Sequence, residues 1–447
     1  MDTLLSISPI DGRYREITDN ISEYFSEYAY IKYRVIIEID WLKYFLKNVL
    51  KEKDDYSYKL LRIIEKFDLG EAKRVKEIEK ITNHDVKAIE YYVREKLKEN
   101  DLSKYLSYVH FGCTSEDINN LAYGKMISDF LNNILFNNIQ ELANAVTKKA
   151  KEYSSVPMPS HTHGQIATPT TIGKELAVFC YRWKSLFELI KEIKLKGKFS
   201  GAVGNFNAHV IAYPEIDWIK CSREFVEEEG LEFNPLTTQI ESHDMISILF
   251  GMMKSFNNVT MDFNSDMWMY ISNNYFKQTI IKTETGSSVM PHKVNPINFE
   301  NSMANIRIAN SIFDSLSDNL QVSRMQRDLS DSSMLRNIGV AFSHTVISLK
   351  QTLKGFSKLE VNKKYLEEEL DKYPEVISEA IQTILRKNKF ENGYELLKEF
   401  SRGQSHTIEE FRGFINSLDI GEDDKFKLMN LTPKSYIGLA DKLCNEV

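Results

Sequence analysis

Residues 286–296 carry the side chains with the clearest chemistry. They read Gly-Ser-Ser-Val-Met-Pro-His-Lys-Val-Asn-Pro, so two hydroxyls, Ser287 and Ser288, follow a glycine in a turn, and Lys293 adds a cation. Asn295 followed by proline is typical of a helix start, with Asn as the N-cap and Pro in the first turn. Because a helix N-terminus carries partial positive charge, this segment predicts a site for a carboxylate. An ordinary surface loop explains any one of these residues, but not the whole string.

Two histidines stand close together in residues 160–169. His161 and His163 precede Gly164, and Thr168-Pro169 predicts a further helix start. Histidine is the side chain that gives or takes a proton near neutral pH, so this segment is a candidate for acid–base work. The alternatives are histidines that only bond the backbone, or a metal site. A metal site needs further ligands, and no third ligand is evident, so we expect no metal.

Two other polar segments precede expected helices. In residues 82–85, Thr-Asn-His-Asp, the carboxylate of Asp85 can orient His84. Residues 114–117, Thr-Ser-Glu-Asp, match a capping box. Their two hydroxyls are therefore either plain helix caps or donors to an anion.

Arginines mark two more candidate segments. Residues 326–336 place Arg327 and Arg336 nine positions apart with Ser332 between them, which suits a bidentate contact to an oxyanion. A solvated polar helix face is the alternative for this segment. Near the N-terminus, residues 8–14 form a turn that ends in an arginine and a tyrosine.

The composition argues against several classes of protein. Of 447 residues, 57 are Lys or Arg and 64 are Asp or Glu, so the formal charge is −7. A protein that binds nucleic acid needs a clustered excess of cations. The net negative charge therefore predicts that this chain does not bind nucleic acid. No apolar run reaches the roughly 18 residues of a membrane span, and no secretory signal is visible. The four cysteines are scattered, so we expect free thiols in a cytoplasmic protein.

Long stretches without Gly or Pro predict long helices. They cover residues 125–156, 174–196, 252–285 and 297–338, with apolar residues at three- and four-residue spacing. A mean globular helix has roughly 11–12 residues. Helices of twice that length predict an all-α fold with an elongated bundle, which buries apolar faces against other subunits as well as against itself.

Breaks in this pattern predict three helical domains. We expect an N-terminal domain over residues 1–111, a central long-helix bundle over 112–364 that assembles into a shared multi-subunit bundle, and a C-terminal domain over 365–447. The sequence near residues 199–211 also allows short β segments.

The string at residues 286–296 resembles the signature of the fumarase/aspartase superfamily, G-S-S-x-M-P-x-K-x-N-P, and meets every fixed position. Within this superfamily the chain resembles the bacterial-type branch that removes fumarate from succinylated purine nucleotides. The resemblance runs from about residue 8 to about residue 340 and continues more loosely to the C-terminus. His161 and Ile166 depart from it, since Arg and Pro are expected there. The other matching segments are residues 9–14, 82–86, 110–117 and 162–165.

This resemblance implies β-elimination of fumarate from adenylosuccinate, giving AMP, and from the succinyl-carboxamide imidazole ribotide of purine synthesis, giving AICAR. It also implies a homotetramer whose active sites combine residues of three subunits, and a reaction without metal or organic cofactor. Three alternatives remain open: another lyase of the superfamily such as argininosuccinate lyase, a non-catalytic protein on the same scaffold as in lens crystallins, and a metal-dependent hydrolase built on His161 and His163.

The resemblance also implies roles for individual residues. Ser287 is the general base, with Ser288 the less favoured choice, and His163 is the general acid. His84 positions the substrate or its phosphate, while Lys293 and Asn295 stabilise the carboxylate beside the reacting carbon. The residues expected to contact substrate are Arg13, Tyr14, Asn83, His84, Asp85, Thr114, Ser115, Gln239, Ser288, Met290, Lys293, Asn295, Arg327, Ser332 and Arg336.

Overall fold

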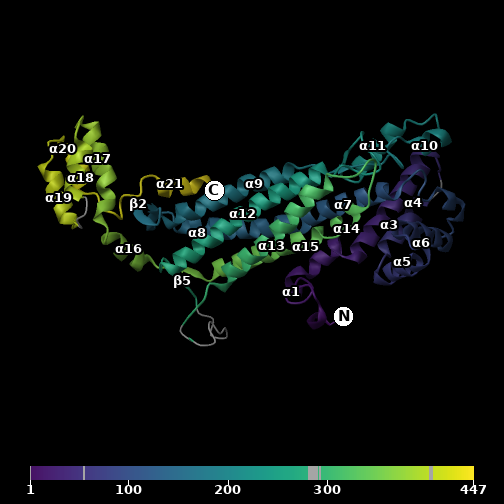
Figure 1. Ribbon diagram of the computed structural model, residues 1–447, viewed down its shortest axis with the longest axis horizontal. Coiled ribbons are helices and arrows are strands. Elements are labelled where there is room, and N and C mark those ends of the chain that lie inside the picture. Colours follow the sequence, from purple (N-terminus) through teal and green to yellow (C-terminus); the bar gives the residue numbers. More distant parts are fainter. Residues whose placement is uncertain (1, 54–55, 280–289, 291–292, 402–405) are drawn as a thin grey trace. The chain divides into compact units, whose positions relative to one another are not determined.

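A computed structural model describes residues 2–53, 56–279, 290, 293–401 and 406–447, and these residues form mainly helices (Figure 1). The chain falls into two compact units. Unit 1 comprises Met1–Ile139, Leu186–Asn258 and Ala304–Lys350, and unit 2 comprises Gln140–Ser185, Val259–Met303 and Gln351–Val447. The described strands form only two-stranded ribbons, which confirms the expected all-α class.

Unit 1 contains the N-terminal helices and the elements that lead into the bundle. They are α1 (Arg15–Thr18), α2 (Ser22–Phe25), α3 (Glu27–Tyr44), α4 (Tyr56–Glu65), α5 (Leu69–Thr82), α6 (Asp85–Glu99), α7 (Ser115–Phe130), α10 (Asn207–Ala212), α11 (Trp218–Glu228), α14 (Ser330–Leu335) and the parallel strands β3 (Lys196–Gly197) and β4 (Glu232–Phe233). Shorter 3-10 and π turns in this unit cover Thr3–Leu5, Asp19–Ile21, Phe45–Val49, Ser103–Tyr108 and Leu131–Leu135.

Unit 2 contains two antiparallel ribbons and the C-terminal helices. They are β1 (Pro157–Thr162), β2 (Gln165–Thr171), β5 (Phe276–Gln278), β6 (Leu359–Val361), α16 (Lys363–Asp371), α17 (Ser378–Lys387), α18 (Gly393–Ser401), α19 (Ile408–Ser417), α20 (Glu422–Met429) and α21 (Ala440–Leu443), with 3-10 turns at Pro374–Ile377 and Cys444–Glu446. Five long helices contribute residues to both units: α8 (Phe136–Glu152), α9 (Ile172–Glu192), α12 (Asp244–Ser272), α13 (Ile297–Leu320) and α15 (Ile338–Ser357).

The N-terminal helices share one hydrophobic core. α3 packs against α4, α5, α6 and α7 in unit 1 (Figure 1). The core includes Ile39, Leu60, Val75 and Ile89, which are almost fully buried. Burial of such side chains stabilises the fold by roughly 1.5–3 kcal/mol each, and it holds α3, α4, α5 and α6 together.

Buried polar side chains hold the long helices in register. In unit 1, Asn257 of α12 donates to Asn310 of α13 at 3.0 Å and to Thr345 of α15 at 3.1 Å. In unit 2, Asn264 of α12 donates to Ser302 of α13 at 2.9 Å. Because buried polar groups are costly without partners, these bonds favour one alignment of the three helices.

The helix predicted over residues 125–156 is present but begins earlier and ends at Glu152, so residues 153–156 are not helical. Helix α7 continues through a π turn at Leu131–Leu135 into α8. Gly124 lies inside α7, where a Cβ would approach the side chain of Leu231 to 2.8 Å. Glycine here serves close packing and does not break the helix.

The prediction of one helix over residues 297–338 is wrong in its second half. Helix α13 ends at Leu320, and the chain is irregular before α14. In this stretch Asp328 accepts backbone hydrogen bonds from Arg324 at 3.1 Å and from Ser330 at 2.9 Å. Ser323 accepts one from the backbone of Asp328 at 3.1 Å. Such local side-chain bonds compete with helical hydrogen bonds.

Two smaller expectations also need correction. Residues 199–211 contain no strand, because α10 occupies the end of this segment and β3 lies just before it. Of the run over residues 252–285, the part up to residue 279 is described, and it is helical only to the end of α12 at Ser272, after which Asn274 adopts a left-handed conformation with φ 59°. Residues 280–285 of this run lie outside the described residues. Within the described residues, no helix combines the length and apolar character that a membrane span requires.

Candidate active site

The predicted site residues are divided between the two units. Those of unit 1 are Arg13, Tyr14, Asn83, His84, Asp85, Thr114, Ser115, Gln239, Arg327, Ser332 and Arg336. Those of unit 2 within the described residues are His163, Met290, Lys293 and Asn295. Ser287 and Ser288 lie outside the described residues.

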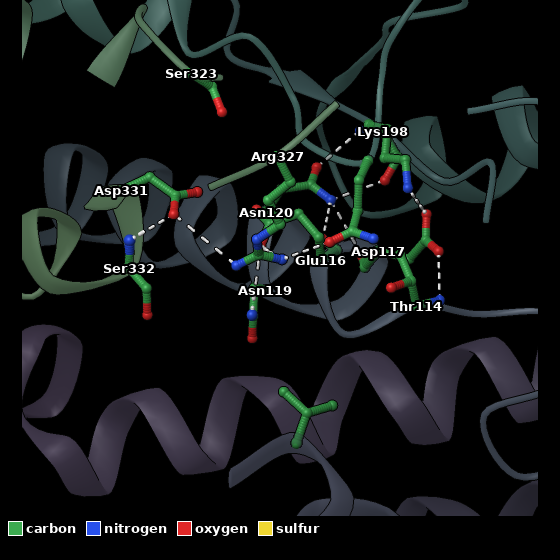
Figure 2. A network of polar contacts seen from close by, with 12 residues as sticks. Thr114, Glu116, Asp117, Asn119, Asn120, Lys198, Ser323, Arg327, Asp331 and Ser332 are labelled. Carbon is green, nitrogen blue, oxygen red and sulfur yellow. Dashed lines mark hydrogen bonds and ion pairs between the residues drawn. The ribbon is translucent and has the colours of Figure 1, made fainter. Parts of the chain in front are cut away.

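The start of α7 is held by a buried ion pair. Asp117 accepts a hydrogen bond from the backbone of Thr114 at 2.8 Å, which confirms the predicted cap (Figure 2). The other oxygen of Asp117 lies 2.8 Å from the ammonium group of Lys198, and both side chains are fully buried. Ser115 is the first residue of α7. The Asp117–Lys198 pair therefore also fixes the position of Ser115.

Arg327 joins several of the predicted residues in unit 1. Its guanidinium lies 3.3 Å from Glu116, 3.9 Å from Asp331, and donates to the side-chain oxygen of Gln239 at 3.3 Å (Figure 2). Asp331 in turn accepts a hydrogen bond from the backbone of Ser332 at 2.7 Å. The structure therefore brings Gln239, Arg327 and the segment carrying Ser332 together.

A second group of charges surrounds Asp85. Arg34, which is 1% exposed, lies 2.8 Å from Asp85, and Arg336 lies 3.5 Å from it. Arg336 also pairs with Glu27 at 2.5 Å and lies over the ring of Tyr30. Burial raises the pKa of Asp85, but Arg34 and Arg336 outweigh it, so this pKa lies below its ordinary value. The carboxylate is therefore ionised and paired at neutral pH.

His84 forms the N-cap of α6. Its Nδ1 accepts a hydrogen bond from the backbone of Lys87 at 3.1 Å. Asn83 ends α5 in a left-handed conformation with φ 50°, so the two residues make the turn between the helices. The expectation that Asp85 orients His84 is wrong, because the two side chains are 3.9 Å apart and Asp85 faces Arg34.

Arg13 and Tyr14 lie in the turn before α1. Arg13 is exposed and Tyr14 is half-buried. A pocket of unit 1 is lined by residues of this N-terminal segment, including Ile10 and Arg15, and by Arg336. The structure thus brings the N-terminal turn and Arg336 to one pocket.

His163 occupies the tip of the β1–β2 hairpin in unit 2. The strands pair as far as Thr162 and Gln165, which leaves His163 and Gly164 as a two-residue turn. Both have positive φ, 54° and 74°, as a type I′ turn requires. The imidazole is exposed, so it is open to a ligand.

This hairpin corrects the helix start predicted at residues 168–169. Thr168 and Pro169 belong to β2, and α9 begins only at residue 172. The cap is Thr171, whose hydroxyl accepts a hydrogen bond from the backbone of Lys174 at 3.1 Å. Strand pairing with β1 outweighs the local Thr-Pro signal here.

The segment before α13 carries the predicted cation. Lys293 is exposed, and its backbone N–H donates to the carbonyl of Met290 at 3.0 Å. Asn295 is half-buried, and the helix begins at Ile297, two residues after the expected cap. Positive charge from the ammonium group and from the helix N-terminus thus occurs within one short segment, as expected.

Sequence reasoning missed a buried cluster in unit 1. Glu116, His243 and Asp331 each place a ligand atom within 4.8 Å of the others. Burial raises the pKa of Glu116 to about 7, against the lowering effect of His243 and Arg327. Glu116 lies inside the Thr-Ser-Glu-Asp motif, and His243 directly precedes a long apolar run, which are the signals that could have marked them.

Among the described residues, these three side chains are the group that could together ligate a metal ion. The guanidinium of Arg327, 3.3 Å from Glu116, already supplies positive charge to it, so a metal ion would meet strong repulsion. Within the described part of the chain, His161 and His163 belong to no such three-ligand group.

Comparison with known proteins matches this chain over nearly its whole length. The family model described as "Lyase" matches residues 12–309, and the model described as "Adenylosuccinate lyase C-terminal" matches residues 323–437. An adenylosuccinate lyase of Legionella pneumophila (strain Corby) is 47% identical, covering 99% of this chain and 98% of the relative. That of Escherichia coli (strain K12) is 44% identical, covering 100% and 99%.

Solved structures support the fold. A fumarate lyase from Mesorhizobium sp. BNC1 superposes with a TM-score of 0.75 at 20% identity, covering 96% of this chain and 97% of that one. The 3-carboxy-cis,cis-muconate lactonizing enzyme from Pseudomonas putida gives 0.74 at 16% identity, covering 96% of each. The full-length similarity to the sequence relatives goes further than fold: this chain is a lyase and belongs to the adenylosuccinate lyase family.

Proposed function

We propose that this protein cleaves adenylosuccinate into AMP and fumarate, and that it also releases fumarate from the succinyl-carboxamide imidazole ribotide to give AICAR. The observation that carries the proposal is the similarity of at least 43% identity over 99–100% of the chain to proteins named adenylosuccinate lyase. The complete string at residues 286–296 supports it, because the chemistry needs a hydroxyl, a cation and a helix start in one segment.

The difficult step is removal of a proton from the carbon beside a carboxylate. That step creates an aci-carboxylate with two negative charges, so the site must gather positive charge around it. We propose that Lys293, Asn295 and the start of α13 supply this charge. Ser287 takes the C–H proton, the electron pair forms the C=C bond of fumarate, and the C–N bond breaks. His163 gives a proton to the departing nitrogen. Ser287 then releases its proton to water, and His163 takes one up from water, so that both groups are reset.

The remaining predicted residues bind the nucleotide and the succinyl carboxylates. Arg327 and Gln239 already contact each other at 3.3 Å, and Arg327 also pairs with Glu116 and Asp331, which adjoin Ser115 and Ser332 in the chain. Arg336 lines a pocket of unit 1 together with Asp11 and Arg15, the sequence neighbours of Arg13 and Tyr14. Cations and hydroxyls of this kind bind phosphate and carboxylate oxygens. Thr114, Asn83, Asp85, Ser288 and Met290 are proposed as further contacts to the substrate, and His84 positions it.

We further propose a homotetramer whose active sites take residues from more than one subunit. The long helices support this, since elongated bundles bury apolar faces against other subunits. The division into domains at residues 1–111, 112–364 and 365–447 remains a prediction. The cytoplasm is the proposed compartment, because all four cysteines are free. The reaction is proposed to need no metal or organic cofactor.

One assay tests the activity. Purified protein is added to adenylosuccinate, and the ultraviolet spectrum and fumarate release are followed with and without EDTA. We expect AMP and fumarate in equal amounts in both cases, and no fumarate from argininosuccinate. Absence of turnover on both proposed substrates contradicts the proposal. Activity that chelation abolishes and zinc restores would instead support a metal-dependent enzyme.

A further inference from the structure

A histidine that the proposed reaction does not use lies buried among carboxylates in unit 1. His243 is 2% exposed, and its Nδ1 lies 3.8 Å from Glu241. Its Nε2 lies 3.9 Å from Oδ2 of Asp331. Both ring nitrogens and this Asp331 oxygen are buried without a hydrogen-bond partner among the described residues. A movement of about 1 Å would turn the contact to Asp331 into a hydrogen bond.

The charges of this cluster are poorly balanced unless the imidazole is protonated. Glu116, Glu241 and Asp331 supply three carboxylates, all at most 6% exposed. Arg327 is the permanent cation beside them, 3.3 Å from Glu116 and 3.9 Å from Asp331 (Figure 2). Uncompensated charge away from water is expensive. With all three carboxylates ionised, an imidazolium at His243 halves the excess negative charge, and a proton on Glu116, whose pKa is raised to about 7, reduces it further.

The backbone at His243 is also held in an uncommon conformation. Its φ is +60°, in the left-handed region that a non-glycine residue rarely adopts. Its N–H donates to Glu241 at 2.7 Å, and its carbonyl accepts the hydrogen bond of Ser247 in the first turn of α12 at 3.0 Å. The surrounding contacts therefore aim the ring into the cluster.

We propose that His243 is a positioning residue, an imidazolium that draws together three segments which each carry a substrate contact. Glu116 follows Ser115 directly, Asp331 directly precedes Ser332, and Glu241 lies two residues after Gln239. The inference rests on the proposed function, since these neighbours are substrate contacts only in that reaction.

The titration of the cluster supports this role. Burial lowers the pKa of His243, but Asp331, Glu116 and Glu241 outweigh burial, so the pKa lies above its ordinary value. The ring faces Glu116 from α7, Asp331 from α14 and Glu241 from its own segment, with Arg327 beside them. The cation is present below this pKa and is lost as the pH rises through it. Substrate binding should therefore weaken on the alkaline side.

Steady-state kinetics on adenylosuccinate between pH 6 and 9 test the proposal in the whole protein. His243→Gln should raise KM about tenfold at pH 7, because it removes the cation that lies beside Asp331 and Glu241, with a smaller change in kcat. His243→Lys, a fixed cation, should restore KM and remove its alkaline rise. The matched control is His344→Gln, a buried histidine whose Nδ1 faces Asn305 at 2.7 Å, and it should keep the wild-type profile.

Equal KM values for wild type and His243→Gln across the pH range overturn the proposal. If His243→Gln does not fold, the ring is followed by NMR in wild-type protein carrying ¹³C-labelled histidine. The His243 signal is the one whose midpoint falls in Asp331→Asn. A midpoint at or below about 6.5 overturns the proposal, as does stoichiometric bound metal that Asp331→Asn releases. If wild type itself does not turn over adenylosuccinate, the proposed function fails, whereas the NMR titration still tests the charge on His243.

Discussion

The ammonium group of Lys198 lies 2.8 Å from the carboxylate of Asp117, and neither side chain is exposed to solvent. Asp117 also accepts backbone hydrogen bonds from Thr114 and Ser200, each at 2.8 Å. One buried pair therefore fixes both the start of α7 and the loop that follows β3. These are the segments that carry Ser115 and approach Gln239, whose side chain donates to the carbonyl of Ala202.

Replacing the cation of this pair should destabilise the protein strongly. Lys198→Met leaves Asp117 as an uncompensated buried charge, which costs about 3–5 kcal/mol of unfolding free energy. Urea unfolding at fixed protein concentration measures it. Lys196→Met is the control, because Lys196 is partly exposed and 3.7 Å from Glu232, so its loss should cost less than about 1 kcal/mol. Equal losses for the two variants would contradict the prediction.

Removal of either proposed proton-transfer group should reduce turnover. Ser287→Ala and His163→Ala should each lower kcat by about 10²–10⁴-fold, the usual contribution of a general acid or base, with circular dichroism unchanged. His161→Ala, in the same hairpin, should lose little activity. If His161→Ala is as inactive as His163→Ala, a joint role for the two histidines becomes the better explanation.

Mixing the two inactive variants tests whether active sites are shared. His163→Ala and Ser287→Ala protein, dissociated together and reassembled, should recover part of the wild-type activity, because some sites then combine two intact contributions. Each variant treated alone is the control and should stay inactive. No recovery at any mixing ratio means that both residues act from one subunit or that the sites are not shared.

Asp40 of α3 should make stability depend on pH. Burial, together with the carboxylate of Glu229, raises the pKa of Asp40 to about 6. Between about pH 4 and 6 the unfolded chain binds fewer protons than the folded one, so stability falls as the pH rises. Asp40→Asn should therefore be more stable by about 2–3 kcal/mol above pH 6, and the difference should shrink toward pH 4. Thermal unfolding from pH 4 to 8 checks this, and a difference independent of pH would contradict it.

The sequence predicted the long helices well and two local structures badly. Absence of Gly and Pro located α8, α9 and most of α12, because helices of that length need no tertiary information to be recognised. The helix cap predicted at Thr168-Pro169 is wrong, because these residues lie in β2, which pairs with β1. A local Thr-Pro pattern does not reveal this pairing. The break after α13 depends on Asp328, whose side chain bonds the backbone in place of a helical turn.

The site was predictable where a local motif carries it. The capping arrangement of Thr114 and Asp117 follows from four adjacent letters. The contact of Arg327 with Gln239 and the cluster at His243 do not, because residues far apart in sequence meet there only after α7, α12 and α14 have packed. A single histidine in a sequence does not indicate whether it will be buried or which carboxylates will face it.

The hairpin tip at His163 and Gly164 restricts how this region can evolve. A Cβ at Gly164 would have open space, so the demand for glycine arises from its φ of 74° and not from packing. Side chains along a ribbon alternate between its two faces. An insertion of one residue at the tip would turn the imidazole toward the opposite face of the ribbon. The length of this turn is therefore under tighter constraint than the identity of the exposed strand residues around it.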